Sequence, residues 1–150
     1  MASSPASTVM NFTGFPTDSL RFLRDLAANN DPAWFKPRRE EYEALVRGPM
    51  IALVADLLTL ASAHKLPLSG EPAKAVFRVH RDVRFSKEKR PYKTHCGASL
   101  SRTGRKLAPG LFYIHIQPGG CFVAAGFWHP GAPVPQPAAP TDPRLSREIR

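Results

Sequence analysis

The residues of this 150-residue chain that could do chemistry are concentrated in one stretch, Arg78–His95, which reads R-V-H-R-D-V-R-F-S-K-E-K-R-P-Y-K-T-H. Arginine offers a planar fork of N–H donors and lysine a point charge, so this clustering is typical of a site for phosphate or another anion. Ser86 would add a hydroxyl group, and backbone N–H groups at Ser86–Lys87 could form an anion-binding nest. The predicted ligand-binding residues are Arg78, Arg81, Arg84, Ser86, Lys87, Lys89, Tyr92 and Lys93. The alternative is a solvated basic loop whose arginines pair with carboxylates.

Three residues of the same stretch, His80, Asp82 and His95, are candidates for proton transfer. Imidazole titrates near neutral pH and therefore suits general acid–base catalysis. No nucleophile or carboxylate pair accompanies them, and we expect Asp82 to orient a neighbouring arginine rather than to act as a base. Catalysis on a phosphate ester therefore stays an alternative to binding. The histidines show no ligand spacing typical of a metal site, so we predict neither a metal nor another cofactor.

The charge of the chain is strongly segregated. The window Lys74–Lys106 holds 11 basic and 2 acidic residues, which equals the +9 excess of the whole chain. A basic segment of this kind favours an anionic partner. Phe85 and Tyr92 interleave with the charge, which is also typical of single-stranded nucleic-acid binding, although no helix-turn-helix or RNA-recognition motif is present. Tyr92, Trp128 and His129 could stack a base, but closing the sheet edge is the favoured role of Tyr92 and Trp128.

Several function classes are disfavoured by missing motifs. The chain lacks the phosphate-binding loop of nucleoside triphosphatases, the dinucleotide-binding fingerprint, the serine-hydrolase elbow and any C-x-x-C pair. Cys96 and Cys121 fit a reducing compartment better than a disulfide scaffold. The N-terminus does not resemble a secretory signal, and no apolar run approaches the length of a membrane span. We therefore expect a cytoplasmic protein without a membrane partner, and predict no particular oligomeric state.

Helices are predicted in the first half of the chain and strands in the second. Leucine spacing predicts a helix over Asp18–Ala28, Asp31–Pro32 starts a second that Pro37 should kink, and a third follows Gly48–Pro49. Alternating or apolar runs then predict four strands: Ala75–Asp82, His95–Ser101, Leu111–Gln117 and Cys121–Trp128. Between the first two strands, the charged stretch Arg84–Thr94 reads as an exposed loop.

This order predicts an α+β fold in which three N-terminal helices pack on a small antiparallel sheet of about four strands. We expect a single domain over residues 11–130. Residues 1–10 should be a disordered tail, and residues 131–150 a proline-rich tail that ends in the start of a helix.

Five segments together resemble an uncharacterised bacterial family, domain of unknown function 2461, over about Asn11–Pro130. They are F-T-G-F-P (12–16), L-R-F-L-R-D-L-A-A-N-N-D (20–31), A-W-F (33–35), F-R-V-H-R-D-V-R-F-S-K-E-K-R-P-Y-K-T-H (77–95) and G-F-W-H-P (126–130). The resemblance implies a cytoplasmic α+β protein and brings no established activity. The sequence departs from the family at Pro37 and in its proline-rich stretch Gly131–Pro140. The resemblance implies that family members continue past the W-H-P segment through further helices. We therefore expect this chain to be a C-terminally truncated member.

Overall fold

The computed structural model describes residues 10–106, 108 and 110–127. Trp128, His129, the predicted tail over residues 131–150 and nearly all of the tail over residues 1–10 lie outside these residues.

The first predicted helix is present as α1 (Thr17–Ala28), which buries Phe22, Leu23 and Leu26 on one side. Its apolar residues recur at the spacing of a helix, so one stripe faces the core. Just before it, the backbone N–H groups of Asn11 and Phe12 donate to the carboxylate of Asp56, at 3.2 and 2.7 Å. The N-terminal segment is thereby held against the longest helix.

The second and third predicted helices form one irregular run over Pro32–Ala63. Its parts are α2 (Pro32–Phe35), the 3₁₀ turn η1 (Lys36–Arg38), α3 (Arg39–Tyr42), the π turn η2 (Glu43–Arg47) and α4 (Gly48–Ala63). The carboxylate of Asp31 caps the start by accepting from the Trp34 N–H at 3.0 Å. Pro37 breaks the regular pattern as predicted, because proline cannot donate to the helical ladder.

The predicted stop at Gly48–Pro49 does not end the helix, and the reason is the π turn that precedes it. A π turn is wider than an α turn and closes hydrogen bonds over five residues. At this turn a Cβ atom on residue 48 would lie 2.7 Å from the carbonyl oxygen of Glu43, so glycine is required there. Gly48 and Pro49 therefore accommodate a continuous helix rather than separating two.

The sheet has three antiparallel strands in the order β1-β2-β3: β1 (Cys96–Ser101), β2 (Gly110–Ile116) and β3 (Phe122–Phe127). The first of the four predicted strands, Ala75–Asp82, is not formed, so this prediction is wrong. Pro72 starts a single helical turn, α5 (Pro72–Ala75), and only isolated bridges follow, Val76 to Ala98 and His80 to Tyr92. The chain leaves the edge of β1 after one bridge because residues 79–93 pair with themselves instead.

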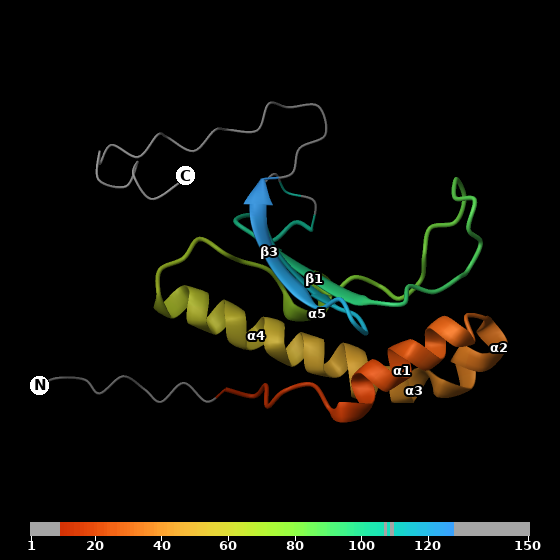
Figure 1. Cartoon of the computed structure of the whole chain (residues 1–150). Coiled ribbons are helices and arrows are strands. Elements are labelled where there is room, and N and C mark those ends of the chain that lie inside the picture. Colours follow the sequence, from red (N-terminus) through yellow and green to blue (C-terminus); the bar gives the residue numbers. More distant parts are fainter. Residues whose placement is uncertain (1–9, 107, 109, 128–150) are drawn as a thin grey trace, which may run out of the picture.

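Residues 79–93, which we call the arm, double back on themselves beside the sheet. The Arg81 N–H donates to the Pro91 carbonyl at 2.9 Å and the Lys93 N–H to the Val79 carbonyl at 2.8 Å. Figure 1 shows the arm extending away from one end of the sheet, while α4 runs below the sheet. The predicted exposed loop thus has a paired base and a charged tip.

The core lies between the helical run and one face of the sheet. Val46, Met50 and Val54 are fully buried, and they belong to one apolar cluster with β1 and β2 residues. From these two strands Cys96, Ala98, Leu100 and Ile114 join the cluster. Side chains alternate along a strand, so residues such as Tyr113 and His115 point to the other face, which we call the outer face. The coarse α+β prediction is confirmed.

The run Pro32–Ala63 is the one helical segment among the described residues that contains a stretch long and apolar enough to cross a membrane, an 18-residue window with a mean hydropathy of 1.7. This finding rests on length and composition alone. The same run supplies the buried residues that pack against the sheet, and packing of this kind also accounts for an apolar helix.

Candidate functional site

Both carboxylates at the tip of the arm, those of Asp82 and Glu88, are engaged by arginines of the same arm. Asp82 binds Arg84 through both carboxylate oxygens, with a shortest distance of 2.8 Å. Glu88 pairs with Arg81 at 3.3 Å and also with Arg90. Lys89 turns back to donate to the Val83 carbonyl at 2.7 Å. Most of the predicted anion cradle is therefore folded onto its own backbone and carboxylates.

The base of the arm has a different arrangement, in which two lysines gather around Phe77, next to Arg78. The ammonium nitrogens of Lys93 and Lys106 lie 5.4 and 4.9 Å from the Phe77 ring centroid. Lys93 donates to the Arg78 carbonyl at 2.8 Å, and Lys106 to the Val76 carbonyl at 3.1 Å. We call Arg78, Lys93 and Lys106 the basic cluster. Across the described part of the chain, no ion pair involves any of the three.

The members of the basic cluster affect one another electrostatically. Partial burial lowers the pKa of the Lys93 ammonium, and the charges of Arg78 and Lys106 lower it further. Partial burial also lowers the pKa of Lys106, with smaller effects from Arg47 and Arg78. Like charges held together disfavour the charged form of each group. An anion placed among them would reverse that effect.

The outer face of the sheet carries a row of aromatic rings next to this cluster. The rings of His95 and His115 stack with centroids 4.4 Å apart, and His115 stacks on Phe122 at 4.7 Å. Tyr113 lies beside this row, 5.8 Å from both His115 and Phe122. The ring of Phe77 is 6.4 Å from that of Tyr113, so the row continues to the basic cluster. We call His95, His115, Phe122 and Tyr113 the aromatic row.

Hydrogen bonds and a glycine hold the aromatic row in place. His115 bonds the Tyr113 hydroxyl through Nδ1 at 2.9 Å and Gln117 Oε1 through Nε2 at 2.8 Å. The Gln117 oxygen can only accept, so Nε2 carries the proton and the tyrosine donates to Nδ1. A Cβ atom on residue 97 would lie 2.6 Å from the Tyr113 hydroxyl oxygen. Gly97 therefore allows the tyrosine to lie flat against β1.

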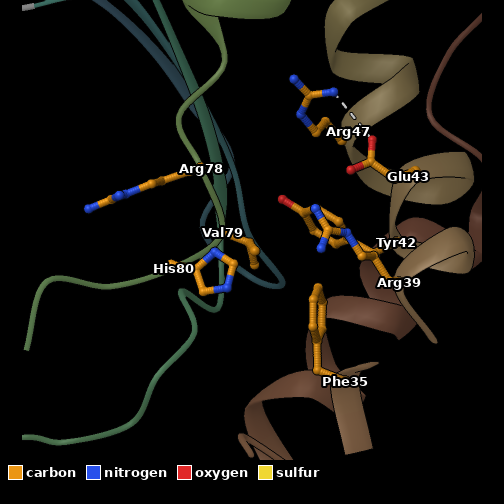
Figure 2. A pocket seen from close by; sticks show the side chains of 8 residues that line it. All are labelled: Phe35, Arg39, Tyr42, Glu43, Arg47, Arg78, Val79 and His80. Carbon is orange, nitrogen blue, oxygen red and sulfur yellow. Dashed lines mark hydrogen bonds and ion pairs between the residues drawn. The ribbon is translucent and has the colours of Figure 1, made fainter. Parts of the chain in front are cut away.

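A narrow cleft of about 100 Å³ separates the helical run from residues 78–80, where the arm begins. Figure 2 shows Phe35, Tyr42 and Arg47 on the helical side, with Val79 and His80 opposite them. The Arg78 side chain points away from this cleft. Small-molecule sites usually enclose about 300–1,000 Å³, so the cleft is too small for a metabolite. We therefore take the open surface formed by the basic cluster and the aromatic row, rather than this cleft, as the candidate site for an anion.

The three predicted proton-transfer residues lie in separate environments. His80 is exposed and lines the narrow cleft, whereas His95 lines a second small cleft beneath the arm. Hydrogen bonds from Arg84 lower the pKa of Asp82 to about 2, so it remains ionised and is a weak base. Burial, followed by the charges of His115, Lys93 and Arg81, lowers the pKa of His95 to about 4. Among the described residues no group of His, Cys, Asp or Glu side chains could hold a metal ion.

The remaining predicted ligand-binding residues are also divided by the fold. Tyr92 is only 3% exposed and packs on Phe35 of the helical run with ring centroids 4.3 Å apart, so it is a core residue rather than one that closes the sheet edge. The Ser86 hydroxyl accepts from the Glu88 N–H at 3.2 Å, and Lys87 is exposed at the tip of the arm. Of the eight predicted residues, only Arg78 and Lys93 belong to the basic cluster.

Sequence reasoning missed Lys106, Phe77 and the aromatic row as parts of one surface. Alternation in the strand Leu111–Gln117 places Tyr113 and His115 on one face, and this signal was available. The partners of these side chains lie on other segments of the chain, and only the register that pairs His115 with Gly97 and with Phe122 brings them together.

Together the fold and the site define a small α+β protein in which three cations, without an ion pair among the described residues, lie next to a row of aromatic rings on the open sheet face. Residues 18–136 match the model of a family described as "Conserved hypothetical protein (DUF2461)". The chain belongs to this family, as the resemblance in the sequence indicated. No curated protein and no solved structure matches the chain.

Proposed function

We propose that this protein binds a phosphorylated or otherwise anionic small ligand, and that the basic cluster holds its anionic group. The observation that carries the proposal is the convergence of Lys93 and Lys106 on Phe77 beside Arg78, with no carboxylate among their ion-pair partners in the described residues. Cations held this close repel one another, and an anion between them would be bound by charge-assisted hydrogen bonds.

The tip of the arm is a weaker candidate for the same role. Arg81 and Arg84 already have carboxylate partners, so an anion there would have to compete with Glu88 and Asp82. Within the described part of the chain, no carboxylate pairs with Arg78 or Lys93. The proposed site therefore lies at the base of the arm rather than along the whole basic stretch.

Catalysis on a phosphate ester has less support than binding. Asp82 is occupied by Arg84, and its low pKa makes it a poor base. Burial raises the pKa of the Cys96 thiol to about 12, so little of the nucleophilic thiolate exists at neutral pH. Binding of nucleic acid remains the other alternative, and its dependence on salt would identify it.

Titration calorimetry with inorganic pyrophosphate, at low and at moderate salt, tests the proposal. We expect Lys106→Gln and Arg78→Gln each to weaken binding at least tenfold, since each removes a charge-assisted hydrogen bond worth about 1.5–3 kcal/mol. Lys87→Gln is the matched control, because it removes the same charge from the exposed tip of the arm.

Equal losses in all three variants would indicate general attraction to a basic surface and would contradict the proposed site. Loss in Lys87→Gln alone would place the anion at the tip. A steep fall in affinity with salt, together with tighter binding to long polyanions, would favour nucleic acid over a small ligand.

A further inference from the structure

The aromatic row presents an open ring at one end. Phe122 lies on the edge strand β3 and is 50% exposed, although its ring stacks on His115. Its neighbour along the strand, Val123, is 61% exposed but points to the opposite face. A phenyl ring held in a fixed orientation on an open surface offers one face for a further stacked ring.

The rings connect this end to the basic cluster without a break. Lys93 lies 5.4 Å from the Phe77 centroid, Phe77 lies 6.4 Å from Tyr113, and Tyr113 lies 5.8 Å from Phe122. The two ring–ring separations are within the range of direct aromatic contact, and the lysine lies within cation–π range of Phe77. One face therefore combines a place for an anion with a place for a flat ring, a few side chains apart.

Cations next to exposed aromatic rings are the combination that proteins use to hold nucleotides. Base stacking on an aromatic side chain is tolerant of base identity and adds to contacts with phosphate. Sugar phosphates and polyphosphates, in contrast, would leave Phe122 without a partner. The surface is thus more complementary to a ligand that carries both groups than to an anion alone.

We propose that the ligand of this face is a nucleotide, whose phosphate lies at the basic cluster and whose base stacks on Phe122 at the end of the aromatic row. This inference rests on the proposed function, because it specifies the ligand of the same site. Free mononucleotides and the nucleotides of a single-stranded nucleic acid share this chemistry.

The test compares AMP with ribose 5-phosphate, which has the same phosphate and no base, by titration calorimetry. We expect AMP to bind about tenfold more tightly. Phe122→Leu should abolish this difference while retaining the binding of ribose 5-phosphate, and Lys106→Gln should weaken both ligands. Val123→Ala, at the adjacent position on the other face, is the matched control and should change neither.

The possible failures separate the two proposals. Equal affinity of the wild-type protein for AMP and ribose 5-phosphate would overturn the nucleotide inference and leave anion binding intact. No binding of either ligand, or of a single-stranded oligonucleotide, would overturn both. An advantage of AMP that survives Phe122→Leu would also overturn the stacking site.

A second measurement does not depend on a variant. Stacking of a base should shift the ring-proton NMR signals of Phe122 when AMP is added, and ribose 5-phosphate should not. Unshifted Phe122 signals at saturating AMP would contradict the inference. Tighter binding of a single-stranded oligonucleotide than of AMP, with the same Phe122 shifts, would identify nucleic acid as the source of the nucleotide.

Discussion

Single residues at the base of the arm show how the protein keeps positive charge in a partly buried place. Lys93 and Lys106 cover the Phe77 ring with their ammonium groups and donate to backbone carbonyls. A cation–π contact at an exposed site contributes about 0.5–1 kcal/mol. These contacts orient the two side chains, and no carboxylate of the residues that the structure describes neutralises them, which favours binding of an anion.

His95 is a residue through which the stability of the fold should depend on pH. Its pKa is lowered from about 6.5 in the unfolded chain to about 4 in the folded protein. Between these values the unfolded chain binds a proton that the folded protein does not, so the free energy of unfolding falls as the pH decreases through this window. Because the side chain is partly solvated, we expect this loss to be on the order of 1 kcal/mol.

Denaturant unfolding of the wild type and of His95→Gln across this window measures the effect. Carboxylates titrate in both proteins, so the difference between the two proteins isolates the histidine. His64→Gln, at an exposed histidine after α4, serves as the control. If the stability difference between wild type and His95→Gln stays constant with pH, the assignment to His95 is wrong.

At the scale of elements, α4 organises both the core and the start of the chain. Its residues Met50 and Val54 pack beneath the sheet, while Asp56 binds the backbone of the N-terminal segment. Phe12 and Phe15 meet edge to face at 5.3 Å in that segment, so the hydrogen bonds to Asp56 hold a small aromatic pair as well. The segment before α1 is thereby part of the fold.

Asp56→Ala should therefore destabilise the protein by about 2 kcal/mol, because it removes two hydrogen bonds to a carboxylate that is 7% exposed. Thermal or denaturant unfolding measures the change. Asp25→Ala is the matched control, since this exposed carboxylate on α1 makes no hydrogen bond among the described residues. Equal stability of the two variants would show that the N-terminal contact is unimportant.

At the scale of the whole molecule, Asn30 connects the helices to the arm. Its side chain donates to the Tyr92 carbonyl at 2.9 Å and accepts from the Tyr92 N–H at 3.0 Å, across 62 residues of sequence. This pair of bonds resembles the pairing of a neighbouring strand. Tyr92 then packs on Phe35, so the orientation of the arm, and of Lys93 beside it, depends on the loop between α1 and α2.

Asn30→Ala should destabilise the protein by about 1–2 kcal/mol and increase amide hydrogen exchange in the arm, because two backbone groups of Tyr92 lose their partners. Hydrogen-exchange mass spectrometry of residues 79–93 measures this. Asn29→Ala changes the neighbouring residue, whose side chain bonds only the Asp25 carbonyl, and should leave the arm protected. Unchanged exchange in Asn30→Ala would refute the proposed connection.

The sequence by itself determined the features that depend on local preference and periodicity. Leucine spacing predicted α1, Pro37 predicted the interruption, and alternating runs predicted β1, β2 and β3. These patterns are local, because a helix or strand repeats its buried side within a few residues. The family resemblance over the same segments was also confirmed.

Only the tertiary structure decided which charges are free and which rings meet. Net charge located the basic stretch, but pairing of Arg84 with Asp82 and of Arg81 with Glu88 depends on how the arm folds back. Lys106 joins Lys93 because both reach Phe77, and Phe122 joins His95 through the register of the sheet. Such contacts bring together residues distant in the chain, and the composition of a single segment does not encode them.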